Sequence, residues 1–261
     1  MKNFFTILRT DFYRAFRSSG FLWGIISTFA IFLFGSIETI YRDGAVVVDF
    51  IYVYRNNITD LLILVATFAY SASFCADCQT RFLYPLTIRS EINTYTLSKS
   101  IVTTVMGGLS VATGTLMFIL YLCIYEENIL PPMYNFDIEL SALAFCDLVL
   151  AGRTGLFFLC YFYAIFLQAA FWALLGLLIS AYLPNKYVAY IGPFILGFGL
   201  NEIANVFDLP RWLDPAKLSA LMMFRRPASQ VIWILTVTFI SYIVICTLLF
   251  IRKAKRRIAN G

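Results

Sequence analysis

No histidine occurs among the 261 residues of the chain, and this absence excludes several kinds of site. A Ser-His-Asp triad, a histidine general base and a histidine-ligated zinc all need an imidazole. The sequence also lacks a Gly-Lys-Ser/Thr phosphate loop, and Gly197-Phe198-Gly199 is followed by Glu202 where a dinucleotide fingerprint needs its third glycine. We therefore expect a chain that is not an enzyme, holds no metal or cofactor of its own and cannot hydrolyse ATP by itself.

Charged residues are scarce as well. They make up 13% of the chain against 61% hydrophobic residues, and the mean hydropathy is +0.79. These values lie outside the range of soluble domains. There is no Pro/Gly/Ser linker or low-complexity tract, so residues 1–261 are predicted to form a single transmembrane domain. The net charge of +5 does not indicate nucleic-acid binding, because each basic cluster abuts an apolar run instead of forming a patch on a folded surface.

Six apolar stretches are long enough to cross a membrane as helices, which takes about 20 residues for a hydrocarbon core of about 30 Å. The predicted fold is an all-α polytopic membrane protein whose six transmembrane helices cover about 21–40, 58–76, 101–124, 154–182, 187–206 and 230–251. A further run, Phe136–Leu150, is short and carries Asp147, and we expect it to be a short external helix at the interface. The first stretch is longer than the apolar region of a signal peptide and has no small-x-small site before Glu38, so it is predicted to be retained.

Lysine and arginine predict the orientation. With an even number of spans both termini share one side of the membrane, and that side holds 13 of the 20 basic residues: Lys2, Arg9, Arg14, Arg17, Arg81, Arg89, Lys99, Lys186, Arg252, Lys253, Lys255, Arg256 and Arg257. By the positive-inside rule we expect a multi-pass protein of the cell membrane with both termini cytoplasmic. A seventh span at Phe136–Leu150 would place the basic tail outside, against the same rule.

Residues 1–18 have the pattern of an amphipathic helix. At 100° per residue the apolar and polar side chains separate onto two faces, Phe4, Phe5, Leu8, Phe12, Ala15 and Phe16 on one and Lys2, Arg9, Thr10, Arg14 and Arg17 on the other. We expect a helix in the cytoplasmic interface, with aromatic rings at the acyl boundary and cations among anionic lipid head groups. The alternative is a charged flank that only orients the first span.

Few ionisable groups are expected inside the spans, since only Glu38 and Glu202 come near and both sit toward the outer ends. Ion-coupled transporters need such groups at depth, so the energy for uphill transport must come from elsewhere. Small residues of the third and fourth spans predict close helix packing, with substrate contact as the alternative: Gly107, Ser110, Gly114, Ala169, Ala173, Gly176 and Ser180. Gln168 needs a partner or a cavity. Gln168 and Glu202 are our candidates for a translocation path.

The six cysteines give no clear site. Cys75 and Cys78 form one C-x-x-C, which is best interpreted as two small apolar residues of a helix, with a redox or metal role as the alternative. A disulfide between Cys123 and Cys146 is conceivable, but nothing in the sequence brings them together.

Two cytoplasmic segments carry a family resemblance. The first runs Asp77-Cys-Gln-Thr-Arg-Phe through Arg89-Ser-Glu-Ile-Asn-Thr-Tyr95-Thr-Leu-Ser98-Lys99, and it resembles the loop of type-2 ABC exporter permeases, where span two enters a short coupling helix and Tyr-x-Leu-Ser/Ala-Lys opens span three. The second, from Leu178 through Pro184-Asn185-Lys186 to Pro193-Phe194, is similar to the tight turn between spans four and five of that family. The order of interfacial helix, six spans and short turns extends the resemblance to the whole chain.

The resemblance implies a membrane subunit of an exporter. Its partners are a second permease, identical or homologous, and cytoplasmic ABC ATPase subunits that bind ATP and Mg. It also implies a re-entrant outer hairpin between spans five and six, which Asn201–Arg226 would form with breaks at Pro210 and Pro215. The ATPase-coupling interface is expected at Arg81, Arg89, Glu91, Tyr95 and Lys99, and the alternative for these charges is a role in topology or in solvation.

The predicted function is that of a permease subunit moving a hydrophobic or amphipathic substrate, such as a peptide, an antibiotic or a lipid. The alternative is a passive channel or structural scaffold that oligomerises through its small-residue faces and has no ATPase partner. A membrane-embedded enzyme has little support, because no pair of nucleophile and base is visible.

Overall fold

The computed structural model describes residues 2–37, 45–54, 59–80, 91–126, 128–130, 144–208, 214–219, 221 and 227–260. Within these ranges the chain consists of helices and turns, with one isolated bridge between Ala45 and Asn128. Five described helices are long and apolar enough to cross a membrane, or six if a bent pair counts as one span. The all-helical fold with the helices of a multi-pass membrane protein is therefore confirmed, and the six-span topology stays a prediction.

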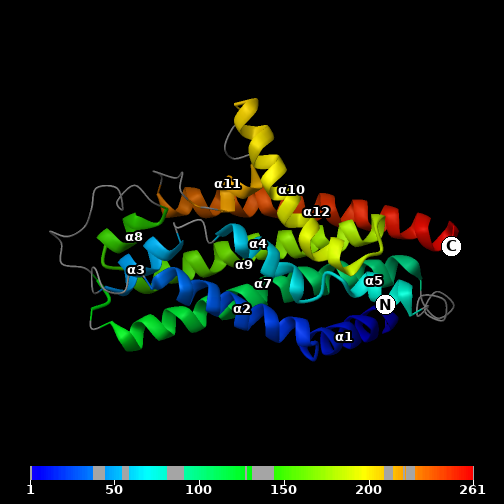
Figure 1. Cartoon of the computed structure of the whole chain (residues 1–261), viewed down its shortest axis with the longest axis horizontal. Coiled ribbons are helices and arrows are strands. Elements are labelled where there is room, and N and C mark those ends of the chain that lie inside the picture. The colour runs from blue at the N-terminus through cyan, green and yellow to red at the C-terminus, as the bar shows by residue number, and fades with distance from the viewer. Residues whose placement is uncertain are drawn as a thin grey trace.

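Four long helices run side by side along the long axis of the molecule (Figure 1): α2 (Ser19–Ser36), α7 (Ile92–Tyr125), α9 (Thr154–Tyr182) and α12 (Ala228–Asn260). The central helix is α9, which contacts α7, α12, α10 and α4. The N-terminal helix α1 (Lys2–Phe16), helix α5 (Ser73–Gln79) and the C-terminal end of α12 lie at one end of this bundle, which we call the terminal end. The short helix α8 (Cys146–Leu150) lies at the other end.

Small residues allow the helices to approach closely. A Cβ on Gly107 of α7 would collide with the side chain of Ala173 of α9, and one on Gly114 would collide with Thr28 of α2. Gly176 of α9 is similarly close to the carbonyl oxygen of Ala189. The predicted packing role of these small residues is confirmed at these positions, and the contacts are made within one chain.

The second predicted span, 58–76, is wrong as a continuous helix. It consists of α4 (Thr59–Phe68) and α5, which are bent by 40° where they meet. No proline or glycine lies in the break, and hydroxyl groups stabilise it instead. The Ser18 side chain lies 3.2 Å from the Ala69 carbonyl oxygen, and Ser71 Oγ donates to the Ala173 carbonyl at 2.7 Å. Ser18 thus bonds a backbone carbonyl of the bend, and Ser71 of the bend bonds a backbone carbonyl of α9.

Helix α3 (Val46–Val53) is a buried element that was not predicted from the sequence. It lies after the first span and packs against α2 and α7 near the α8 end. Its first two backbone N–H groups donate to the carbonyls of Asn128 and Ile129, at 3.0 and 3.3 Å. These bonds satisfy donors that a helix leaves free in its first turn, and they fix the start of α3 to the segment after α7.

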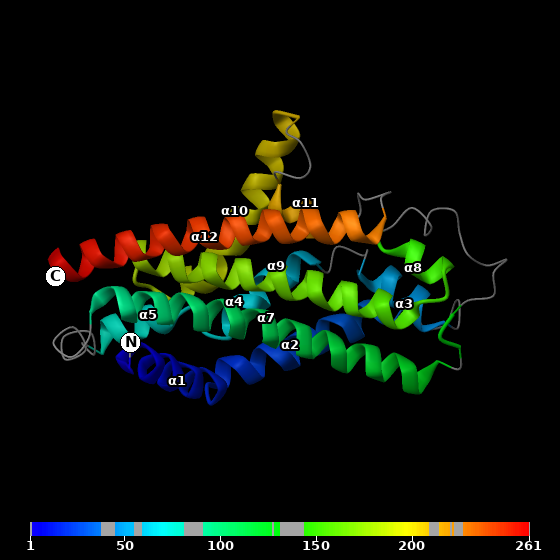
Figure 2. The same cartoon turned by 180° about the vertical axis from the view of Figure 1, so that it is seen from behind.

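Helix α10 (Lys186–Val206) starts against α9 and α4, but its C-terminal part projects away from the bundle in both views (Figures 1 and 2). The predicted hairpin Asn201–Arg226 lies partly outside the described residues. Helix α11 (Pro215–Ser219) contacts α10 and α9, and the Lys217 ammonium bonds to the side-chain oxygen of Asn205. These contacts do not test a return into the membrane, so the hairpin stays a prediction.

Other boundaries differ from the prediction mainly at the terminal end. Helix α7 begins at Ile92, about two and a half turns before the predicted start of the third span, and α12 continues past 251 to Asn260. Of the expected external helix Phe136–Leu150, residues 144–150 are described, and α8 occupies the last five. Polar residues continue both long helices because a helix that is already packed on its neighbours can extend beyond its apolar part.

Candidate functional site

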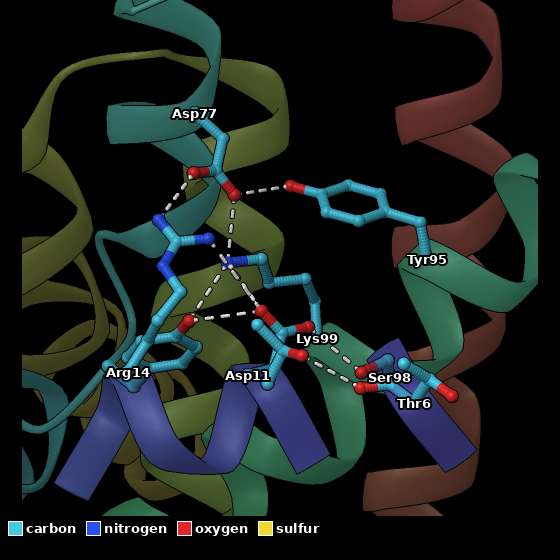
Figure 3. Close-up of polar contacts among 9 residues, drawn as sticks. Thr6, Asp11, Arg14, Asp77, Tyr95, Ser98 and Lys99 are labelled. Atoms are coloured by element: carbon cyan, nitrogen blue, oxygen red, sulfur yellow. Dashed lines mark hydrogen bonds and ion pairs between the residues drawn. The ribbon is translucent and has the colours of Figure 1, made fainter. Parts of the chain in front are cut away.

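Seven polar side chains meet at the terminal end of the bundle, and we call them the ionic cluster (Figure 3). They come from α1, from the break and helix after it, and from α7: Asp11, Arg14, Tyr70, Asp77, Tyr95, Ser98 and Lys99. Three segments that are distant in sequence are thus joined by charge.

The central contact joins Lys99 of α7 to Asp77 of α5. Lys99 Nζ lies 2.8 Å from Asp77 Oδ2, and the two side chains are 0% and 2% exposed. Tyr95, one turn before Lys99 on the same face of α7, donates its hydroxyl to the same carboxylate oxygen at 2.7 Å. A buried ion pair is tolerated only with such close geometry and additional hydrogen bonds.

Asp11 brings α1 into the cluster. Its carboxylate lies 3.5 Å from Lys99 Nζ, and it accepts hydrogen bonds from the hydroxyls of Ser98, at 2.9 Å, and Tyr70, at 3.3 Å. The Tyr70 oxygen also accepts from Lys99 at 3.0 Å. Because Tyr70 lies in the break between α4 and α5, the cluster contacts the bend of that span directly.

Arg14 closes the cluster on the solvent side. Its guanidinium donates to Asp77 Oδ1 at 3.0 Å and lies 3.9 Å from Asp11, and its side chain is 42% exposed. Partial burial opposes the charged guanidinium, but the attraction of Asp77, together with that of Tyr70 and Asp11, outweighs it and raises the pKa of Arg14. Two cations therefore face two carboxylates, and the formal charges of the four groups cancel.

The position of the cluster along the chain gives it a mechanical consequence. Asp77 lies just before residues 81–90, and Tyr95, Ser98 and Lys99 lie just after them. Both ends of this connection are consequently bound to each other and to α1. A force applied to residues 81–90 would reach α1, α5 and α7 together.

The structure corrects the predicted role of two coupling residues. Tyr95 is 3% and Lys99 0% exposed, so neither side chain is a surface contact for a partner. The residues of the Tyr95-Thr-Leu-Ser98-Lys99 motif instead bind Asp77 and Asp11 inside the chain. Glu91 is exposed just before α7, as an interface residue must be, while Arg81 and Arg89 lie outside the described residues.

Helix α1 agrees with the amphipathic prediction in part. Phe5 and Phe16 are exposed apolar residues, Arg9 is exposed, and Phe12 is half-buried. The face that packs on the bundle, however, carries the buried Asp11. The buried position of Asp11 was not predicted, although the sequence contains a signal for it: Asp11 lies among Leu8, Phe12 and Ala15 in the helical spacing of the apolar face. Arg14, which we expect among lipid head groups, is 42% exposed and also binds Asp77.

Several acidic and basic side chains are buried in the protein, but none of them lies within a predicted span, so the expectation of few ionisable groups inside the spans stays a prediction. Asp11, Asp49, Asp77, Lys99 and Asp214 are all buried. The hydropathy pattern does not indicate that Asp77 and Lys99 are buried, because both lie at the ends of apolar runs, where charged side chains normally reach water. Their burial depends on partners from segments that are distant in the sequence.

The other predicted polar site is a separate contact near α3. Gln168 is 2% exposed, and its amide oxygen accepts from the Tyr54 hydroxyl at 3.2 Å, among the rings of Phe50 and Tyr161. The partner that a buried amide requires is therefore present. Glu202 is exposed on the projecting part of α10, so the two candidates for a translocation path are not brought together.

The cysteines are all unpaired, including Cys123 and Cys146, so the conceivable disulfide is absent. Among the described residues no group of His, Cys, Asp and Glu could hold a metal ion. When the sequence is compared with protein-family models none matches, and no curated protein is similar enough to count as a relative.

Proposed function

We propose that the chain is the membrane-spanning permease subunit of an ATP-driven exporter of the type-2 ABC class. It moves a hydrophobic or amphipathic substrate, such as a peptide, an antibiotic or a lipid, outward by alternating access. Its partners are a second permease and a separate ATPase that binds ATP and Mg. Both termini are cytoplasmic, so the terminal end of the bundle faces the ATPase.

The observation that carries this proposal is the ionic cluster at the base of residues 81–90. A permease without a nucleotide site must receive work from a partner through a cytoplasmic contact, and that contact is useful only if it moves transmembrane helices. Asp77 and Lys99 bind the two ends of residues 81–90 to each other, and Asp11 and Arg14 bind both to α1. A push on this connection therefore moves α1, α5 and α7 as one unit, which is the motion that alternating access needs.

The channel or scaffold alternative loses its main support. It relied on small-residue faces that would join copies of the chain. Gly107, Gly114 and Gly176 are instead occupied by Ala173, Thr28 and Ala189 of the same chain. A scaffold also has no need for a buried ionic cluster beside its connection, since buried ion pairs contribute weakly to stability compared with apolar packing.

The test is co-expression with an ABC ATPase encoded beside this chain, followed by co-purification and an assay of ATP hydrolysis in lipid. We expect the two to co-purify and the permease to change the hydrolysis rate. Reversing both charges, Arg89→Glu with Glu91→Arg, should weaken association while insertion remains intact. Arg153→Glu is the matched control, because Arg153 is exposed at the other end of the bundle and should change neither.

If the chain purifies alone and the ATPase hydrolyses ATP at the same rate with and without it, the exporter proposal is wrong and the channel or scaffold replaces it. If the ATPase binds but charge reversal has no effect, the coupling surface lies elsewhere than at residues 81–91.

A further inference from the structure

The exposed face of α12 changes from apolar to cationic near its C-terminal end. Between Trp233 and Leu249 the exposed side chains are apolar except Ser241, which bonds to its own helix. The next exposed side chains are Arg252, Lys255 and Arg256, which we call the cationic face. The opposite side of the helix stays packed on the bundle through Phe250 and Ala254, both 0% exposed. Both faces keep helical spacing, so the cationic face continues the apolar one without a break.

The two other basic residues of this segment turn toward the bundle and fix its position. The Arg257 guanidinium donates to the carbonyls of Ala181 and Tyr182 at 3.0 and 3.3 Å, where α9 ends. Lys253 Nζ lies 4.5 Å from the centre of the Tyr182 ring. Arg252, Lys255 and Arg256 make no ion pair or side-chain hydrogen bond with the described residues. These three charges are therefore exposed on a packed helix and have no charged partner among the described residues.

The depth of the cationic face follows from the length of α12. Along the helix the rise from Trp233 to Arg252 is about 28 Å, at about 1.5 Å per residue. This matches a hydrocarbon core of about 30 Å. Trp233, 70% exposed, then lies at one boundary of the core and Arg252 at the other, as aromatic and basic residues do in membrane helices. The three cations are at the level of lipid phosphates.

We propose that this part of α12 is a binding site for an anionic phospholipid. The phosphate binds to Arg252, Lys255 and Arg256, and an acyl chain lies along Leu248 and Val244, which precede Arg252 on the same exposed face. Clustered cations directly after a membrane helix attract anionic lipids, and guanidinium groups bind phosphate in a bidentate manner. The proposal depends on the membrane placement of α12 and does not depend on an ATPase partner.

The position of the site favours a lipid over an acidic protein. A soluble partner could contact Lys255 and Arg256, but it would not reach the apolar residues that complete the site, because they lie within the hydrocarbon. Free phosphate would bind the cations without using Leu248. A phospholipid uses both parts of the face at once.

Native mass spectrometry of the purified full-length chain tests the site. The chain is mixed with equal amounts of phosphatidylglycerol and phosphatidylcholine of the same acyl chains. Wild type should retain phosphatidylglycerol preferentially, and the triple variant R252Q/K255Q/R256Q should lose this preference by about tenfold. The charge-conserving variant R252K/K255R/R256K should keep it. Arg153→Gln, at the other end of the bundle, should behave as wild type, whereas Arg252→Gln should not.

Two further arms identify the occupant. Leu248→Gln should weaken phosphatidylglycerol binding with the cations intact, and millimolar inorganic phosphate should not displace the lipid. The proposal is overturned if the triple variant keeps the preference, if Arg153→Gln lowers it equally, or if inorganic phosphate displaces the lipid. It is also overturned if the triple variant loses only association with an acidic cytoplasmic protein while lipid binding is unchanged.

Discussion

Replacing Lys99 by methionine removes the central charge of the ionic cluster while keeping most of the side chain's volume. Lys99 is 0% exposed, and its Nζ contacts Asp77 at 2.8 Å and Asp11 at 3.5 Å. The variant leaves two buried carboxylates with Arg14 as their remaining cation. Breaking a buried ion pair by removing one partner costs about 3–5 kcal/mol. Because Arg14 still binds Asp77, we expect about 3 kcal/mol, a fall in Tm of about 6–12 °C for a chain of this size.

A double-mutant cycle separates the ion pair from side-chain packing. Asp77→Asn alone leaves Lys99 with one carboxylate partner and should also be destabilising. In the variant that combines Lys99→Met and Asp77→Asn neither partner of the broken pair remains, so its loss should be smaller than the sum of the two single losses by about 1–3 kcal/mol. The readout is thermal unfolding of the purified chain in detergent, followed by tryptophan fluorescence. Lys255→Met is the control, since Lys255 is exposed and should change stability by less than about 0.5 kcal/mol.

Two results would refute the reasoning. The first is a Lys99→Met chain that unfolds at the wild-type temperature, which would mean that the buried charge contributes nothing to the fold. The second is strict additivity in the cycle, which would mean that Lys99 and Asp77 act independently despite their contact.

Three other predictions concern topology and packing. Single cysteines at Asn128 and Asn260, in a chain without native cysteines, should be labelled from outside and from inside intact cells respectively, and external labelling at Asn260 would reverse the topology. Gly107→Ala should destabilise the chain by about 1–3 kcal/mol, because the added Cβ meets a side chain of α9. The control Gly155→Ala has no atom within 4 Å of the added Cβ and should be neutral or slightly stabilising. Equal melting temperatures of the two variants would contradict this prediction. Tyr54→Phe should cost about 1–3 kcal/mol, measured by unfolding in detergent, because it leaves a buried amide of α9 without its donor; a wild-type Tm would show that water replaces the hydroxyl.

The long helices could be predicted because their signal is local. Helix α9 occupies 154–182 as expected, and the bounds of α10 differ from the prediction by one residue at the start. An apolar run of sufficient length needs no knowledge of the remaining fold. Helix α3 and the break between α4 and α5 gave no such signal. Val46–Val53 is too short to cross a membrane, and Tyr70 and Ser71 are the only residues with polar side-chain groups between Phe68 and α5.

The candidate site was predicted only in outline. The segment Asp77–Lys99 was predicted as a contact for a partner, and Tyr95 and Lys99 within it are instead buried. The sequence could not reveal that Lys99 faces inward, because the burial of its charge depends on two carboxylates, one from α1 and one from α5, that the fold places beside it. Asp11 could have been noticed as a lone acid on an apolar face, and such a residue indicates a buried cation nearby.

The bend of the second span and the ionic cluster are parts of one arrangement. Tyr70 lies in the break, and its hydroxyl contacts Lys99 and Asp11. Ser18, which caps the start of α2, lies beside the carbonyl of Ala69 in the same break. The angle between α4 and α5 therefore depends on the positions of α1, α2 and α7, all of which are fixed by short polar contacts. A shift of α1 or α7 would therefore act on the residues of the break through those contacts. On the proposed function, the break is where motion at the terminal end is converted into movement of a membrane helix.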